Sequence, residues 1–277
     1  MMEARYKIGD ISSLLGIPAQ TLRFYEEKGI IKPYRDEHDG YRYFDAWDVN
    51  YLMDTLYLRS LEFPLAEVEQ LLNEDSLPDV CGKFMRQENE ILKKIAHYRR
   101  MLGVLTAHRQ SLQSIESRKG RLVSCKSREM VFHRHRRNYS FQSLESGTFQ
   151  GLKKEVKDWV DSIMEASPTF LIPADGIQGV PKDTPYWWGW SMDPELALEK
   201  HMDAVLPNEY LPSVESIYTV FEAGGRGTFM DCFYEQVLKP IRRTGRQLSG
   251  NPYGRLIAKV HEENGFHRYF EVWVPTE

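Results

Sequence analysis

A regular repeat of apolar residues between Phe84 and Glu116 constrains this chain more than any other feature of its sequence. The spacing alternates between three and four, and apolar side chains fill seven of the ten a and d positions; the exceptions are Glu88, Arg109 and Glu116. The seven are Phe84, Ile91, Ile95, Tyr98, Leu102, Leu105 and Leu112. This pattern predicts a coiled-coil helix, roughly 50 Å long at about 1.5 Å per residue. So narrow a seam needs a partner, either another copy of the helix or the helix's own domain.

A pair of short helices is predicted ahead of this repeat. Residues 6–16 are predicted to form a short helix, because Ile8, Ile11, Leu14 and Leu15 lie on one face at helical spacing, and Gly16 ends it because glycine tolerates a left-handed backbone. A second helix over residues 18–28 is expected to bury Leu22 and Phe24. Two short helices around a tight turn match a helix-turn-helix, whose second helix enters the major groove of DNA.

A hairpin and two further helices are expected next. Strand-like residues 30–35 and 41–44 flank an Asp39-Gly40 turn, which is typical of a small β-hairpin, or wing. Asp45 is placed to cap the helix that follows, and Pro64 opens the helix after that one. The segment before the long repeat is therefore expected to be a winged helix-turn-helix.

The chain is mixed α/β from residue 130 onward. Strands are predicted at 130–135, 186–191, 216–222, 255–260 and 269–274, and helices at 149–164 and 228–244. The order strand, helix and then strands occurs twice, which indicates an internally duplicated module. The fold class of the whole chain is therefore α+β.

Composition narrows the class of protein further. The chain has 277 residues, enough for more than one domain, and a net charge of −4, so phosphate contacts must come from a few placed cations. No segment approaches the roughly 18 to 20 apolar residues of a membrane span or looks like a secretion signal, so we expect a cytoplasmic protein with no membrane partner. Cys81, Cys125 and Cys232 are odd in number and far apart, which favours reduced thiols over disulfides.

Three ordered motifs carry a family resemblance. They are Ile8-Gly9-Asp10-Ile11, the run TLRFYEEKGII from Thr21 to Ile31, and GYRYF from Gly40 to Phe44. Together they resemble the MerR family of transcription regulators. The resemblance implies a DNA-binding domain over 1–77 and an antiparallel coiled-coil homodimer through 78–120. It also implies a palindromic promoter whose distortion lets RNA polymerase engage. Glu62 departs from the family, which usually has glycine there.

The remainder of the chain, 121–277, resembles the GyrI-like effector domain of multidrug-binding MerR regulators. Its cues are Tyr218 and Phe221 on one strand, Gly224-Gly225 before a helix, Gly254 before a strand, and the ending FEVWVP. The resemblance implies a ligand-responsive DNA-binding activator that senses a hydrophobic small molecule and needs no cofactor.

Six residues are predicted to contact DNA. They are Gln20, Thr21, Arg23, Tyr25, Arg42 and Tyr43. The first two lie at the start of the recognition helix, where base edges are usually read. The arginines can fork to guanine or hold phosphate, and the tyrosine hydroxyls can bond phosphate. Packing in the core is the alternative for the tyrosines, and a solvated surface charge is the alternative for the arginines.

Nine residues of the second half are predicted to form an effector site. They are Tyr186, Trp188, Trp190, Tyr218, Phe221, Tyr253, Tyr269, Glu271 and Trp273. On the last strand a carboxylate stands between two aromatic rings on one face, at 269, 271 and 273. An aromatic cage with one acid suits a lipophilic cation. The alternative is that these rings only fill the core and Glu271 faces solvent.

Two other functions are weighed against drug sensing. Cys81 and Cys125 lie near the two ends of the long helix, where metal- or thiol-responsive relatives hold cysteines that can bind a soft metal. No C-x-C or C-x-x-C pair accompanies them, so no metal ligands are assigned. Some GyrI-like proteins resemble hydrolases with a tyrosine and a glutamate, but no metal-protease motif or nucleophile elbow is present, so we expect no enzyme activity and assign no catalytic residues.

Overall fold

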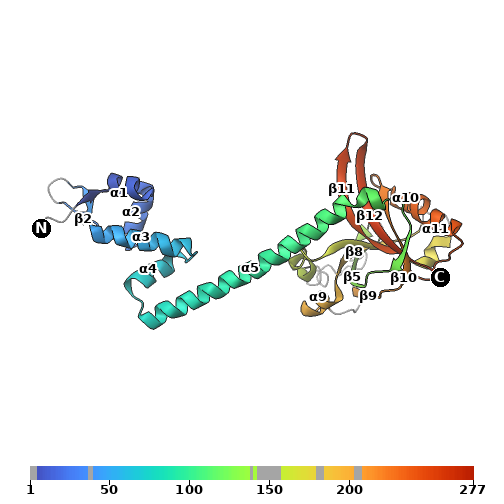
Figure 1. Ribbon diagram of the computed structural model, residues 1–277, viewed down its shortest axis with the longest axis horizontal. Helices are drawn as coiled ribbons and strands as arrows, with labels where there is room; N and C mark the ends of the chain where they lie inside the picture. The colour runs from blue at the N-terminus through green and yellow to red at the C-terminus, as the bar shows by residue number, and fades with distance from the viewer. Residues whose placement is uncertain (1–4, 37–39, 138–139, 142–156, 179–183, 203–207) are drawn as a thin grey trace. The chain divides into compact units, whose positions relative to one another are not determined.

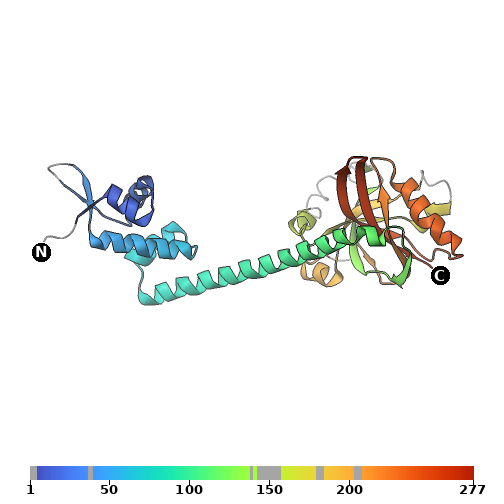
Figure 2. The same cartoon turned by 45° about the horizontal axis from the view of Figure 1, so that its top comes forward.

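The computed structural model describes residues 5–36, 40–137, 140–141, 157–178, 184–202 and 208–277. The chain forms two compact units, residues 1–99 and residues 100–277. Figures 1 and 2 show mostly helical structure in the first unit and a large sheet in the second.

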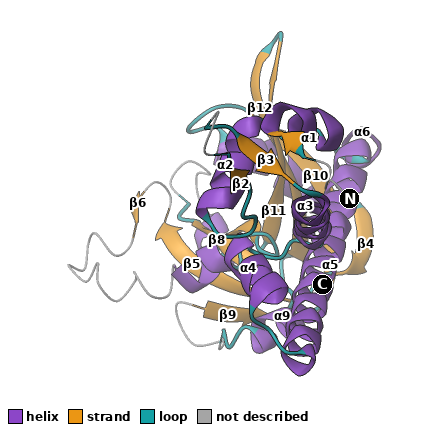
Figure 3. Cartoon of the chain, turned by 90° about the vertical axis from the view of Figure 1, so that its left-hand side faces the viewer, coloured by secondary structure: helices purple, strands orange, loops and turns teal. Residues whose placement is uncertain are grey.

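Short helices and a small sheet make up the first unit. Its elements are β1 (Tyr6–Lys7), α1 (Ile8–Leu15), α2 (Ala19–Glu27), β2 (Tyr34–Arg35), β3 (Arg42–Phe44), α3 (Ala46–Ser60), α4 (Leu65–Asn73) and the start of α5 (Leu77–Gln113). The strands form a three-stranded antiparallel sheet in the order β1-β3-β2. Figure 3 shows β2 beside β3. The predicted winged helix-turn-helix is confirmed, but Tyr6 and Lys7, predicted as the start of the first helix, form the strand β1 instead.

The main apolar core packs α1 and α2 against β3 and α3, and a smaller cluster of Leu58, Phe63 and Val68 packs α4 against the end of α3. The main core contains Ile11, Ile17, Leu22, Tyr25, Ile30, Ile31, Phe44 and Leu52. The predicted burial of Leu22 is confirmed, but Phe24 is 43% exposed. Residues 30 and 31 pack in the core ahead of the wing strand, which begins only at Tyr34.

The turns between the helices have the predicted chemistry. Gly16 has φ 66°, the left-handed conformation expected at the end of α1. The Asp45 carboxylate accepts a hydrogen bond from the Asp48 backbone N–H at 2.8 Å, so Asp45 caps α3 as predicted. Glu62 lies directly before Phe63 and Pro64 with φ 66°, so a non-glycine residue occupies the left-handed region there.

The predicted long helix is α5, with 37 residues. At about 1.5 Å per residue it is about 55 Å long. In this single chain the seam residues other than Ile91 are 36% to 65% exposed, and Ile91 is half-buried. The middle of the helix therefore does not use this seam to dock on its own domain.

A large sheet with helices forms the second unit. Its strands are β4 (Val123–Lys126), β5 (Met130–Arg137), β6 (Ser140–Phe141), β7 (Ser167–Leu171), β8 (Trp187–Met192), β9 (Asn208–Leu211), β10 (Glu215–Ala223), β11 (Tyr253–Glu262) and β12 (Gly265–Pro275). Its helices are α6 (Ile115–Arg118), the 3-10 turn η1 (Ala174–Gln178), α9 (Pro194–Glu199), α10 (Phe229–Phe233), the π-helical turn η3 (Tyr234–Leu238) and α11 (Lys239–Arg243). Of the helix predicted at 149–164, residues 157–161 are helical, and residues 149–156 lie outside the described residues.

The strand order confirms the predicted duplication. The sheet runs β4-β10-β12-β11-β7-β8-β5-β6, and β9 pairs with β5. The order β10-β12-β11 in the later half matches β5-β8-β7 in the earlier half, and the two halves meet where β11 pairs with β7. The strands β4, β6, β7 and β9 were not predicted from the sequence.

The two faces of this sheet have different surroundings. One face packs against α10, η3 and α11 through a large aromatic cluster that includes Phe170, Phe221, Phe229 and Phe270. The other face holds Tyr253 and Trp273 together with the half-buried Tyr218. Because side chains alternate along a strand, neighbouring residues of β12 belong to opposite faces.

Candidate DNA interface and effector site

The recognition helix α2 presents polar side chains at the surface. Gln20 and Arg23 are exposed and Thr21 is half-buried, while Leu22 lies in the core on the opposite side. An exposed arginine beside an exposed amide on one short helix is the arrangement that a major-groove reader needs.

The two predicted tyrosine contacts are less accessible. Tyr25 is only 8% exposed and belongs to the apolar core of the first unit. Tyr43 is half-buried on β3, where it pairs with Lys7 of β1 and Tyr34 of β2. Packing therefore accounts for most of the Tyr25 side chain, which was the alternative for the tyrosines, and its contact with DNA stays a prediction.

Arg42 joins the wing to the recognition helix. Its Nε donates to the Glu26 carboxylate, with N–O distances of 2.7 and 2.9 Å. Both side chains keep about a third of their surface exposed, at 34% and 28%. Arg42 thus fixes β3 against α2, and it can approach phosphate only beside Glu26.

Basic and aromatic residues of the wing were missed by the sequence analysis. The Arg5 guanidinium lies 4.9 Å from the centroid of the Tyr34 ring, and the Lys7 ammonium lies 5.2 Å from that of Tyr41. Both rings are more than half exposed. In the sequence, the feature that could have indicated these residues is the pair of cations Arg5 and Lys7, two residues apart around the short strand β1.

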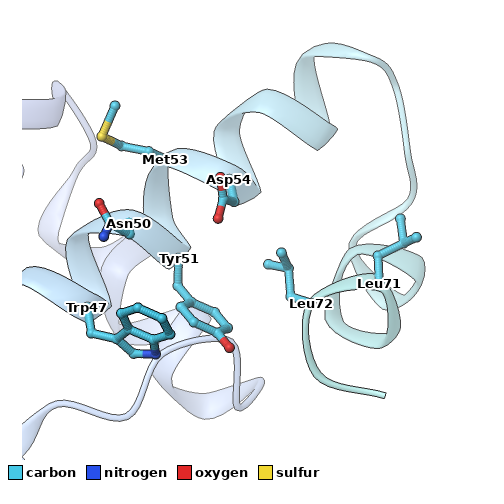
Figure 4. Close-up of a pocket in the computed structure, with 7 residues that line it drawn as sticks. All are labelled: Trp47, Asn50, Tyr51, Met53, Asp54, Leu71 and Leu72. Atoms are coloured by element: carbon cyan, nitrogen blue, oxygen red, sulfur yellow. The ribbon is translucent and has the colours of Figure 1, made fainter. Parts of the chain in front are cut away.

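A hollow of about 470 Å³ lies between α3 and α4 (Figure 4). Trp47, Asn50, Tyr51, Met53 and Asp54 line it from α3, and Leu71 and Leu72 line it from α4. Trp47 is 67% exposed and Met53 is 54% exposed. The hollow shares no residue with the predicted DNA contacts.

The residues predicted for the effector site are divided between the two faces of the sheet. Tyr186, Trp188 and Phe221 belong to the aromatic cluster under α10 and α11, so their main role is packing. Trp190 lies 4.7 Å from the ring of His135 and packs beside Trp159. The nine predicted residues therefore do not form a single aromatic cage, which differs from the prediction from the sequence.

The other five residues do gather on one face. The Trp273 ring is 5.6 Å from that of Tyr218 and 5.9 Å from that of Tyr253. Tyr269 packs with Val220 and Ile115 farther along the same face. Glu271, between Tyr269 and Trp273 on β12, is 6% exposed, so it does not face solvent.

The Glu271 carboxylate already has partners in the chain. Arg255, its register neighbour on β11, donates from Nε to Oε1 at 2.7 Å and also from Nη2. The Tyr218 hydroxyl donates to Oε2 at 3.3 Å, and Arg118 Nη1 lies 3.9 Å from the same oxygen. Sequence analysis identified the acid but neither arginine.

Tyr218 remains a hydrogen-bond donor over the whole neutral range of pH. Burial, and then the negative charge of Glu271, raise the pKa of its phenol to about 12, and Arg118 opposes part of this rise. A neutral phenol beside a carboxylate acts as a fixed donor.

A cavity of about 210 Å³ adjoins this cluster. Arg255 lies on its wall with Val104, Met130, Glu165, Ser191 and Asp193 among others. Its mixture of apolar, charged and hydroxyl side chains can orient a small ligand.

The cysteines show little that favours a metal or thiol sensor. Cys81 is exposed, and Cys125 is half-buried on β4. Burial raises the pKa of the Cys125 thiol, which lowers its thiolate fraction at neutral pH. Within the described ranges, no group of three or more histidine, cysteine or acidic residues could hold a metal ion.

Comparisons with known proteins find sequence similarity in the first unit. Residues 6–75 match the family model of the MerR HTH family regulatory protein. The chain is 30% identical over 100 residues to the HTH-type transcriptional activator TipA of Streptomyces coelicolor, covering 36% of this chain and 39% of TipA. It is 26% identical over 112 residues to the HTH-type transcriptional regulator SkgA of Caulobacter vibrioides, covering 40% and 44%. The matched region thus spans less than half of each relative.

Solved structures show more distant similarity. The EcmrR chain from a cryo-EM structure of its DNA complex covers 98% of this chain and 99% of its own length, at 16% identity and a TM-score of 0.36. HiNmlR bound to promoter DNA covers 41% of this chain and 96% of its own length, at 24% identity and a TM-score of 0.33.

In the part of the chain that the structure describes, no helix is both long and apolar enough to span a membrane.

Proposed function

We propose that this chain, whose residues 6–75 match the model of the MerR family of helix-turn-helix regulators, is an effector-responsive regulator that binds double-stranded promoter DNA. The observation that carries the proposal is the exposed pair Gln20 and Arg23 on α2, a helix held to the wing by the Arg42–Glu26 ion pair. In this proposal α2 reads the major groove and the wing lies along the phosphate backbone.

The functional form is a homodimer. The apolar seam of α5 is exposed in the single chain, and a second α5, packed antiparallel, would cover it. Two copies of α2 would then meet the two halves of a palindromic site. Dimerisation also doubles the few phosphate contacts that an acidic chain can make.

The division of labour follows the elements of the chain. Residues 1–77 bind DNA, residues 78–120 dimerise, and residues 121–277 form a GyrI-like effector domain. Binding of the effector changes the conformation of the bound dimer, which distorts the promoter so that RNA polymerase can use it. Such a deformation costs several kcal/mol, so the effector must favour the distorting form by a comparable amount. The protein works in the cytoplasm.

The effector is a small aromatic or lipophilic molecule, and we propose that it carries a positive charge. Tyr218 and Tyr253 each place a ring within 6 Å of the Trp273 ring, and Glu271 supplies the only buried carboxylate on this face of the described sheet. Aromatic faces and a desolvated carboxylate bind cations well. In this role Tyr218 and Glu271 are ligand contacts, and no catalytic step is assigned to them.

The DNA assignment is tested by fluorescence anisotropy with the double-stranded DNA upstream of the protein's own gene. Arg23→Ala should weaken binding about tenfold or more, since a good contact to a base is worth about 1–3 kcal/mol. Arg243→Ala, which removes an exposed arginine from α11 in the second unit, is the matched control and should leave affinity unchanged. Equal affinities for the two variants would show that α2 is not the reading element.

A further inference from the structure

Arg118 of α6 caps the end of the long helix. Its Nη2 donates to the carbonyl oxygen of Ser111 at 3.0 Å, and its Nε donates to that of Ser114 at 3.3 Å. The last carbonyls of a helix lack partners within the helix and carry its negative dipole end, so a guanidinium there is stabilising. The end of α5 is therefore held by this guanidinium together with the Ser114 hydroxyl, which donates to the carbonyl oxygens of Gln110 and Ser111.

The same guanidinium reaches the proposed effector site. Nη1 donates to the Tyr218 hydroxyl oxygen at 2.6 Å and lies 3.9 Å from Glu271 Oε2. The centre of the guanidinium is 5.9 Å from the centroid of the Tyr218 ring. Arg118 thus occupies the place where an aromatic ring and a buried carboxylate together attract a cation.

The charges of this cluster decide what can bind there. Arg255 neutralises Glu271 from the side of Oε1, and Arg118 adds a second positive charge on the side of Oε2. An incoming cation would add to this net positive charge in a site that is largely shielded from solvent, which is unfavourable. If Arg118 leaves as the cation enters, the net charge stays the same.

We propose that the Arg118 guanidinium occupies a cation-binding site formed by Tyr218 and Glu271, and that an organic cation binds at this site by displacing Arg118. Displacement also removes the cap from the end of α5, so ligand binding changes the stability of the last turn of the dimerisation helix. This rests on the proposed effector role of the second unit. It adds the element through which the ligand acts.

Competition of this kind has a defined thermodynamic consequence. A ligand that binds only after Arg118 has moved away has an apparent affinity equal to its intrinsic affinity multiplied by the fraction of molecules in which Arg118 is displaced. By reciprocity, the ligand destabilises the Arg118 cap by the same factor. Removing the guanidinium should therefore strengthen cation binding, whereas removing an ordinary contact residue would weaken it.

The test uses the full chain without DNA and tetraphenylphosphonium as the probe, with binding measured by calorimetry and by quenching of tryptophan fluorescence. Arg118→Met keeps much of the apolar stem and removes the charge; it should bind the probe about tenfold more tightly, since a hydrogen bond to a charged group is worth about 1.5 kcal/mol or more. Arg121→Met is the matched control, three residues along and exposed, and should bind like the unchanged protein. Arg118→Lys should fall between them.

Hydrogen exchange supplies a second measurement on the same samples. Saturating probe should speed exchange of the amides at 111–118 in the unchanged chain and leave them unaffected in Arg118→Met, whose cap is already lost. Equal or weaker probe binding by Arg118→Met, or unchanged exchange in the saturated protein, overturns the proposal. Absence of probe binding in every variant also overturns it, yet leaves the DNA-binding proposal standing, because anisotropy with Arg23→Ala tests that separately.

Discussion

Glu62→Gly should stabilise the first unit, although it removes an ion pair. Glu62 has φ 66°, and its carboxylate pairs with the Lys94 ammonium on α5. A left-handed backbone costs a non-glycine residue about 1–2 kcal/mol. Glycine removes that strain but adds about 0.4–1 kcal/mol of chain entropy to the unfolded state. The ion pair is solvent-exposed, with both side chains at least half accessible, so its loss matters little. The net gain is about 1 kcal/mol.

Hydrogen exchange of the full chain measures this gain, since it reports on the first unit apart from the second. Amides of α3 and α4 that exchange through unfolding of this unit should exchange about fivefold more slowly in Glu62→Gly. Glu62→Gln keeps the backbone angle and removes the charge, so it isolates the contribution of Lys94. Faster exchange in the glycine variant, matched by the glutamine variant, would show that the ion pair outweighs the strain and would refute the reasoning.

Two further predictions concern other parts of the chain. Leu105→Glu places a charge in the exposed seam of α5 and should convert a dimer to monomers in light scattering, whereas Gln110→Glu, outside the seam, should leave the mass unchanged. The raised pKa of Tyr218, about 12 against an ordinary 10, means that its contribution to stability is complete below pH 10 and is lost as pH rises toward 12. Urea unfolding across that interval should show a decline that is shallower in Tyr218→Phe.

The sequence was most informative where structure is local. Gly16 and Asp45 determine the ends of helices through their own backbone or side chain, so both could be predicted from residue type and position. The 37-residue helix follows from its repeat. The resemblance to a known family fixed the order of these pieces and flagged Glu62 as unusual before its backbone angle was known.

The effector site shows where prediction from sequence stops. Alternation along β12 correctly placed Tyr269, Glu271 and Trp273 on one face, because strand periodicity is local. The partners of Glu271 depend on tertiary structure. Arg255 faces it only through the register of two strands that contain a bulge, and Arg118 comes from a helix far away in the chain. Aromatic residues gave no local signal for which face of the sheet they occupy.

Gly254 shows how closely the pairing of β11 with β12 controls this site. A Cβ atom built on Gly254 would fall within contact distance of the Glu271 carbonyl oxygen and 2.7 Å from a carbon of the Phe170 ring. The oxygen belongs to β12 and the ring to Phe170 of β7, the strands on the two sides of β11, so neither can move away without disturbing the pairing of β11. Overpacking of this kind costs about 3 kcal/mol.

Gly254→Ala should therefore lower the Tm of the second unit by at least about 6 °C, given about 2–4 °C per kcal/mol for a unit of this size. Gly225→Ala is the matched control, because a Cβ there meets nothing within 4 Å. The alanine at 254 should also weaken tetraphenylphosphonium binding, since the two strands carry Arg255 and Glu271 into contact. A variant with unchanged Tm and unchanged probe affinity would mean that the strands have room to spare, and that the tight pairing does not hold the site together.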